Sequence, residues 1–164
     1  MLNFVKILAL VALAGPASSE TRVVFGPAEV LDAGHLRVRG QVFKLSGIWA
    51  PAVNHQCDHG WACGAWAAGE VAARYDGRDV LCVEMKPEIN EVTEAVCLDG
   101  RREIGADLVA SGLAFAPAQG PYGREVARSR RVGAGLRALG VHGTSQVHPP
   151  RKAQPRIQSA KMTP

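Results

Sequence analysis

Four cysteines constrain this chain of 164 residues more than any other feature: Cys57, Cys63, Cys82 and Cys97. Whether they cross-link the fold depends on the compartment, and the N-terminus indicates export. Residues 7–14 are an unbroken apolar run, preceded by Lys6 and followed by the small residues 15–19. This is the pattern of a cleavable secretory signal. We therefore expect residues 1–19 to be a signal peptide and the mature chain to be periplasmic or secreted, where disulfides persist.

An even number of cysteines in an exported chain favours two disulfide bridges, for which three pairings exist. Cys82 and Cys97 each lie in the middle of a strand-like segment, and these two segments are expected to be antiparallel neighbours. A bridge across the two strands is sterically plausible, and Cys57 with Cys63 would then close a short loop. This pairing is the one we favour.

The alternative for the loop cysteines is a metal site. Its ligands would be His55, Cys57, His59 and Cys63, a short mixed cluster that suits zinc or copper. Oxidised thiols cannot ligate a metal, so with disulfides in place we expect no metal here.

The order of apolar segments predicts an α+β fold, mainly β with helices. Strand-like segments cover residues 23–30, 36–39, 42–45, 47–49, 80–85 and 94–98, and helical segments cover 64–75, 104–111 and 122–132. Residues 86–93 are expected to be a polar loop. This order favours a five-stranded Greek-key barrel of the OB type with three packed α-helices. An α+β sandwich fits the pattern almost as well.

The positive charge is concentrated at the C-terminus. The chain carries a net charge of +4. Residues 141–164 have no apolar period and hold prolines and basic residues, so we expect a disordered tail after a domain of residues 20–140. Without Lys6 and the basic residues of that tail, 14 basic residues face 15 acidic ones. Nucleic-acid binding by the domain is therefore not the default expectation.

Five segments occur in a fixed order along the chain. They are residues 30–35 (VLDAGH), 43–52 (FKLSGIWAPA), 63–64, 107–114 (DLVASGLA), and 122–128 followed by 135–136. Together they resemble the thermonuclease (staphylococcal nuclease-like) family over residues 27–140. The resemblance implies an OB-type barrel with three helices that cuts DNA or RNA with calcium. In that family, two aspartates and a main-chain group hold the metal, a glutamate activates water, and two arginines hold the phosphate.

Most of that machinery is missing here. Asp32 remains, but the second aspartate of the turn is replaced by Gly34. The aspartate before Ala-Pro is Trp49, the glutamate after it is Ala52, and the arginine positions hold Lys44 and Val92. We therefore expect a catalytically inactive relative without a cofactor. The alternative is a calcium-dependent nuclease in which nearby acids have taken over the catalytic role, the candidates being Glu88, Glu91 and Glu94.

The function we expect is that of an exported binding or accessory module. Its ligand cleft would contain Asp32, Lys44, Trp49 and Trp61. The chain would act as a monomer without a membrane span, on a protein or an anionic polymer. Trp66 is expected to pack in the core, and Trp49 and Trp61 to pack or to stack on bases or sugars. A basic cluster on the last helix is either a solvated face or a contact for an acidic polymer: Arg124, Arg128, Arg130 and Arg131. By analogy with exported bacterial relatives, a further alternative is an accessory role in exopolysaccharide (succinoglycan-type) biosynthesis.

Overall fold

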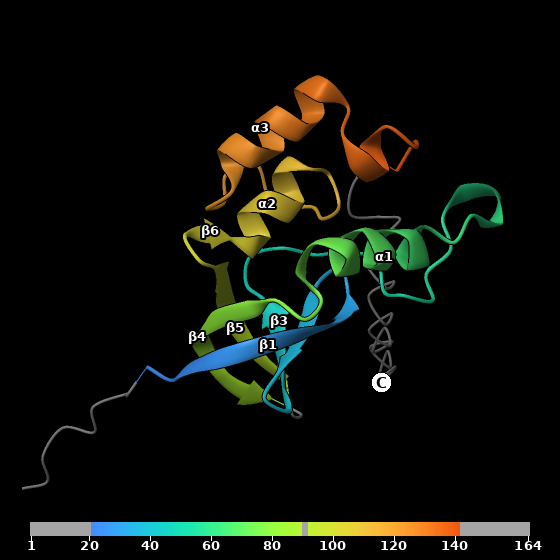
Figure 1. The fold of residues 1–164 in the computed structure, drawn as a ribbon. Helices are drawn as coiled ribbons and strands as arrows, with labels where there is room; N and C mark the ends of the chain where they lie inside the picture. The colour runs from blue at the N-terminus through green and yellow to red at the C-terminus, as the bar shows by residue number, and fades with distance from the viewer. Residues whose placement is uncertain (1–20, 90–91, 142–164) are drawn as a thin grey trace, which may run out of the picture.

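The computed structural model describes residues 21–89 and 92–141 (Figure 1). The expected signal peptide lies outside these residues, and so does the expected tail except for Val141. Val141 is buried, so the packed domain reaches at least this residue. No helix in the described part of the chain is both long and apolar enough to span a bilayer.

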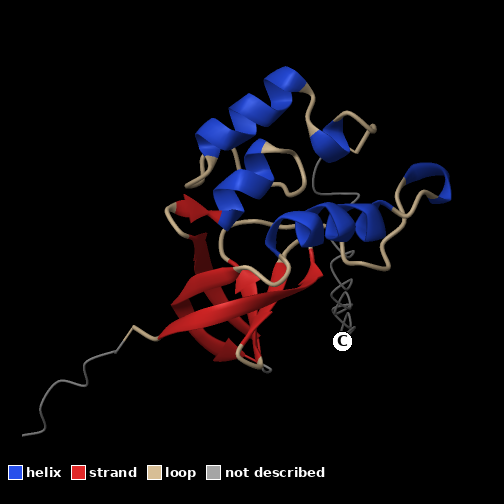
Figure 2. Cartoon of the chain, in the orientation of Figure 1, coloured by secondary structure: helices blue, strands red, loops and turns tan. Residues whose placement is uncertain are grey.

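Five strands form a closed barrel (Figures 1 and 2). They are β1 (Val23–Asp32), β2 (His35–Val38), β3 (Gln41–Leu45), β4 (Asp79–Ile89) and β5 (Val92–Asp99). β1 pairs antiparallel with β2 and β4, while β2–β3 and β4–β5 are also antiparallel. The parallel pairing of β3 with β5 closes the ring. The predicted OB-type barrel is confirmed, and the sandwich alternative is wrong.

Three helices cover the barrel from one side, with α3 outermost (Figure 1). α1 (Cys63–Tyr75) packs against β1, α2 (Ile104–Ala110) against β5, and α3 (Gly123–Val132) against α2. A short strand, β6 (Arg102–Glu103), pairs with β5, and two 3-10 turns, η1 (Asp58–Gly60) and η2 (Gly135–Arg137), complete the elements. The largest fully buried side chains come from both the barrel and the helices, so one core serves the whole domain: they include Phe43, Phe115, Leu36, Leu45, Ile104, Leu108 and Leu136.

Two local predictions were wrong. The segment 86–93 is mostly strand, because β4 continues to Ile89 and β5 begins at Val92, with Ile89 opposite Val92. Backbone pairing sustains such a hairpin arm without an apolar side-chain pattern. Residues 47–49 do not form a strand. Gly47 has φ of +71°, which interrupts the extended run, and Trp49 forms only an isolated bridge to Phe115.

Both disulfide bridges are present, and none of the described cysteines is free. Cys82 faces Cys97 directly in the β4–β5 register, with a Cα–Cα distance of 4.1 Å, and both are completely buried. Cys57 is joined to Cys63, which ties the loop before α1 to the first residue of that helix. This is the pairing that the sequence favours.

Candidate functional site

In the turn between β1 and β2, the carboxylate of Asp32 is hydrogen-bonded to neighbouring residues. Asp32 Oδ1 accepts a 2.7 Å hydrogen bond from the backbone N–H of Gly34. The Nδ1 atom of His35 lies 2.9 Å from Oδ1 and 3.0 Å from Oδ2 of the same carboxylate. Both carboxylate oxygens therefore have a partner within the turn.

The segment around Trp49 lies beside this turn. A Cβ atom added at Gly34 would lie 3.6 Å from Ala50 Cβ and 3.6 Å from Asp32 Oδ1. Trp49 exchanges two backbone hydrogen bonds with Phe115, of 2.9 and 2.8 Å. The structure thus brings together two of the positions where the resemblance implies metal ligands, and they hold a glycine and a tryptophan.

A row of ionisable side chains crosses the outer face of the barrel. His35 on β2 is opposite Lys44 on β3, and Lys44 is opposite Glu94 on β5. Val92 is two residues before Glu94 and so faces the same side of the strand. The resemblance implies a second cationic side chain near Lys44. At this place β5 has Val92 and the carboxylate of Glu94 instead. Glu94 also accepts a 3.1 Å hydrogen bond from the Ser46 hydroxyl.

These residues do not fit a calcium site. Calcium needs six to eight oxygen ligands, usually including several carboxylates. Among the side chains that the structure describes, those of residues 21–85 and 92–141, no group of three acidic or histidine side chains gathers at Asp32. Of the acids considered as replacements, Glu94 faces Lys44 instead, and the side chains of Glu88 and Glu91 lie outside the described part.

Trp61 lies away from the Asp32 turn, next to Trp66 and η1. Its ring lies 5.9 Å from that of Trp66, centroid to centroid, at an interplanar angle of 47°. Trp61 also lines a hollow of about 520 Å³ beside η1, together with His59, Leu139 and Val141. The four residues of the expected cleft are therefore distributed over the β1–β2 turn, β3, the Phe115 bridge and this hollow.

The metal-ligand candidates are only partly assembled. His55, Cys57 and Cys63 have ligand atoms within 4.8 Å of one another, and this is the one such cluster of three in the described residues. His59 is not part of it. Both sulfurs are engaged in the Cys57–Cys63 bridge, so the oxidised cluster offers a metal only the imidazole.

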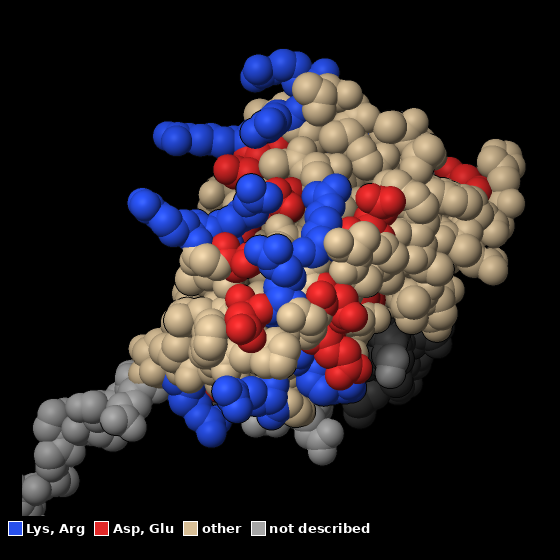
Figure 3. All heavy atoms as spheres, in the orientation of Figure 1, with Lys and Arg blue, Asp and Glu red and all other residues tan. Residues whose placement is uncertain are grey.

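An arginine-lined groove runs along the helical side of the molecule. It consists of two adjoining hollows of about 890 and 570 Å³ that share Arg102 and Asp107 in their lining. Figure 3 shows basic side chains gathered on this face over the end of α1, the β5–β6 turn and α3. We call it the arginine groove, after its six arginines: Arg74, Arg78, Arg101, Arg102, Arg124 and Arg128.

Half of these arginines have acidic partners. Arg78 lies 2.9 Å from Asp99, and Asp107 lies 3.3 Å from Arg74 and 3.8 Å from Arg102. The other three form no ion pair within 4.0 Å among the described residues and remain available to a ligand: Arg101, Arg124 and Arg128.

Only part of this groove was predicted from the sequence. Of the basic cluster predicted on the last helix, α3, Arg124 and Arg128 line the groove, while Arg130 and Arg131 do not. The arginines of α1 and the β5–β6 turn were not predicted to lie beside that cluster. The adjacent Arg101 and Arg102 after Asp99-Gly100 were the available signal, because a basic pair in a tight turn is exposed.

Comparison of the sequence with protein-family models gives no match, and comparison with curated proteins gives no significant relative. The resemblance to the thermonuclease family therefore depends on the five sequence segments and on a barrel and helices compatible with that fold.

Proposed function

We propose that this chain is an exported, catalytically inactive relative of the thermonuclease family that binds an anionic polymer through the arginine groove. The observation that carries the proposal is the set of three arginines without acidic partners in that groove, Arg101, Arg124 and Arg128. The guanidinium group is always charged and binds carboxylate or phosphate in a bidentate way.

The absence of catalysis is supported at the former active site. In-line attack on a phosphodiester needs an activated water and preorganised positive charge at the phosphoryl oxygens. Here Asp32 is bound to His35, Trp49 offers no oxygen ligand, and Glu94 faces Lys44. The carboxylate of Glu94, next to Lys44, would repel a phosphate bound at this place.

The shape and charge of the groove favour a polymer with well-separated negative charges. The free arginines come from the β5–β6 turn and α3 and line two adjoining hollows, an arrangement that suits an extended ligand. Four acids also line the groove, namely Asp99, Glu103, Asp107 and Glu125, and they would repel the dense charge of duplex nucleic acid.

Recognition of a single strand by stacking is also poorly supported. Tyr75 is the aromatic residue of the lining, and its hydroxyl is bonded to Asp107, whereas single-strand binders stack bases on exposed rings. A carboxylated polysaccharide therefore suits the groove best. An accessory role in exopolysaccharide biosynthesis is a second candidate function, which the same groove would serve.

The test measures binding of the oxidised mature chain, residues 20–164, to a carboxylated polysaccharide such as polygalacturonate and to single- and double-stranded DNA. We expect the polysaccharide to bind more tightly at matched salt. The double variant Arg101→Glu/Arg124→Glu should weaken binding at least tenfold and flatten its salt dependence. Arg130→Glu is the matched control, since Arg130 is exposed on the same helix but does not line the groove; it should change affinity less than twofold.

Two outcomes would contradict the proposal. Equal losses in the groove variant and in Arg130→Glu would remove the groove from the binding function. Calcium-stimulated cleavage of DNA or RNA by the purified chain would show an active nuclease, and loss of that cleavage in Glu94→Gln would assign a relocated acid.

A further inference from the structure

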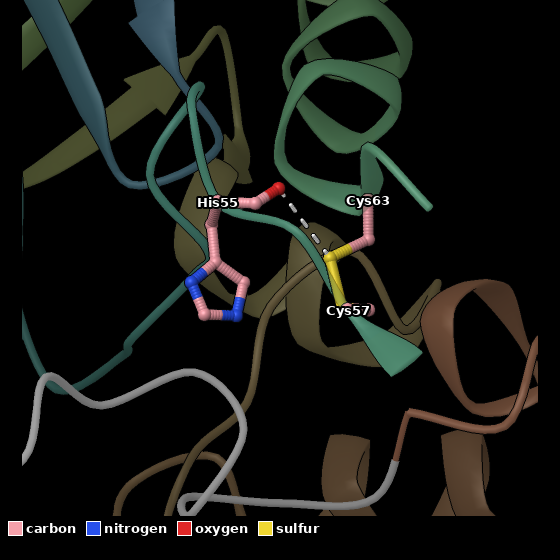
Figure 4. Close-up of side chains that lie close together, drawn as sticks. All are labelled: His55, Cys57 and Cys63. Atoms are coloured by element: carbon pink, nitrogen blue, oxygen red, sulfur yellow. Dashed lines mark hydrogen bonds between the residues drawn. A yellow bond between two sulfur atoms is a disulfide. The ribbon is translucent and has the colours of Figure 1, made fainter. Parts of the chain in front are cut away.

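The Cys57–Cys63 bridge, whose Cys63 is the first residue of α1, lies beside His55 of the preceding loop (Figure 4). One nitrogen of His55 and the two sulfurs all lie within 4.8 Å of one another. The backbone carbonyl of His55 also faces Cys63 Sγ at 3.8 Å. Three groups that ligate soft and borderline metals thus meet at one place, two of them joined to each other.

Backbone hydrogen bonds hold these three residues independently of the bridge. The N–H of His55 donates to Ala52 O at 2.8 Å, and the N–H of Gly64 donates to His55 O at 3.1 Å. The N–H groups of Cys57 and Cys63 both donate to Trp61 O at 2.8 Å. Because this frame does not use the sulfur–sulfur bond, we expect the backbone of the three residues to keep its place when that bond breaks, so that only the side chains move.

The two bridges of the molecule differ in accessibility. Cys82 and Cys97 are completely buried between β4 and β5. Cys57 is partly exposed and lines the hollow that contains Trp61 and His59. Thiol–disulfide exchange requires direct attack by a thiolate on a sulfur, so we expect a reductant to act on the partly exposed Cys57–Cys63 bridge before the buried pair.

We propose that His55, Cys57 and Cys63 form a redox-gated zinc site. A dithiol reductant gives two electrons to the Cys57–Cys63 bond, which breaks to two thiols while the reductant becomes a disulfide. Zn²⁺ then binds both sulfurs as thiolates and the imidazole nitrogen, releasing two protons to solvent. The fourth position is open to water or an external ligand. In the oxidised chain the site is closed.

The donor set and its spacing suit zinc. Two sulfurs and one nitrogen are ligands that zinc accepts in a tetrahedral arrangement. With Zn–S bonds of about 2.3 Å, the two sulfurs would lie about 3.8 Å apart. The ligand atoms need to move by no more than about two ångströms from their positions in the bridge, which side-chain rotation at Cys57 can supply.

The test uses the mature chain, untreated or reduced with a phosphine, and Co²⁺ as a spectroscopic probe before competition with Zn²⁺. The reduced chain should bind one metal, with the thiolate-to-cobalt charge-transfer band and the visible bands of tetrahedral Co²⁺. The untreated chain should show neither. Alkylation under native conditions followed by mass spectrometry should label Cys57 and Cys63 while Cys82 and Cys97 stay joined.

Variants assign the ligands. Cys57→Ser should abolish the charge-transfer band of the two-thiolate site, and His55→Ala should weaken zinc binding at least tenfold. His59→Ala is the matched control, since His59 lies outside the cluster, and should change affinity less than twofold. After reduction, Cys82→Ala/Cys97→Ala should bind metal as the reduced parent does, and circular dichroism checks that it is folded.

Three results would overturn the proposal. The first is a reduced, folded chain that binds neither metal. The second is equal binding by the untreated chain. The third is loss of the native circular dichroism spectrum when only the Cys57–Cys63 bridge is reduced, because the backbone frame would then not hold the ligands.

Discussion

The hydroxyl of Tyr75 donates a 2.8 Å hydrogen bond to Asp107 Oδ2 and so joins the last residue of α1 to α2 within the lining of the arginine groove. Burial and this carboxylate raise the pKa of Tyr75 above its ordinary value. Tyr122 is in the same situation: burial and its hydrogen bond to Glu103 raise its pKa. These are the two tyrosines of the chain.

The raised pKa values predict a loss of stability in alkali. The unfolded chain releases both phenolic protons near pH 10, whereas the folded chain keeps them. The two tyrosines therefore contribute fully to the unfolding free energy below about pH 10, and this contribution is lost as the pH rises above it. Phenolate absorbance should stay absent in the folded protein above pH 10 and rise with unfolding. A phenolate signal that titrates near pH 10 in the folded state would contradict this prediction.

The variant Tyr75→Phe isolates one of these contributions. At neutral pH it should cost about 1 kcal/mol of unfolding free energy, because Asp107 loses a buried donor. It should also reduce the loss of stability between neutral and alkaline pH. Urea unfolding at both pH values measures both effects, and an unchanged alkaline loss would count against the assignment to Tyr75.

Two glycines of α1 should respond in opposite ways to replacement by alanine. A Cβ at Gly64 would lie 1.8 Å from the Ala52 carbonyl oxygen, whereas one at Gly69 would meet nothing within 4 Å. We expect Gly64→Ala to destabilise the protein by at least about 2 kcal/mol, since backbone must move. Gly69→Ala should stabilise it by about 0.5–1 kcal/mol, because alanine is the better helix former. Thermal unfolding compares the two, and equal effects would mean that the loop before α1 does not pack on Gly64.

The fold could be read from the sequence because its signals are local. The alternation of apolar residues predicts the strands that contain Phe43 and Cys97. Gly112 predicts the C-terminal end of the helix that the structure shows as α2. The strand residues 86–89 and 92–93 were not predicted, because the segment has no regular apolar alternation and backbone pairing makes these residues strand. Trp49 was expected in a strand because its neighbours are apolar, but the backbone conformation of Gly47 is not visible in composition.

The candidate site was harder to predict, because it depends on residues distant in the sequence. Arg74, Arg101 and Arg124 line adjoining hollows only when α1, the β5–β6 turn and α3 are packed together. The approach of His55 to the Cys57–Cys63 bridge is different, since all three lie within nine residues. Their closeness was predictable, but the backbone hydrogen bonds that fix them were not.

The two disulfides should differ in their contribution to stability. The chain-entropy estimate gives about 3 kcal/mol for the Cys82–Cys97 bridge, whose sequence separation is 15, and about 2 kcal/mol for Cys57–Cys63, whose separation is 6. Replacement of Cys82 and Cys97 also leaves a gap in the core. Urea unfolding of the two double-alanine variants should therefore rank Cys82→Ala/Cys97→Ala as the less stable. The opposite ranking would show that the loop before α1 carries more of the stability than this estimate allows.

Acids introduced at the positions where the resemblance implies metal ligands should differ in their cost to stability. A Cβ atom at Gly34 meets only ordinary contacts, at 3.6 Å or more, but the position is buried and adjoins the Asp32 carboxylate. We therefore expect Gly34→Asp to lower the unfolding free energy through charge repulsion, but by less than Trp49→Asp does. Trp49 packs against the core, and its indole Nε1 is buried. Trp49→Asp should therefore cost about 2 kcal/mol or more, from lost packing and a partly buried carboxylate.

Calcium provides a second measurement on the same variants. In Gly34→Asp the new carboxylate lies beside Asp32, and their mutual repulsion is relieved by a cation, so millimolar calcium should raise the midpoint of thermal unfolding of this variant. The parent chain and the conservative control Gly34→Asn should show no such shift. If the parent is stabilised by calcium as much as Gly34→Asp is, the β1–β2 turn still holds a metal, and the interpretation of Asp32 as fully occupied by Gly34 and His35 is wrong.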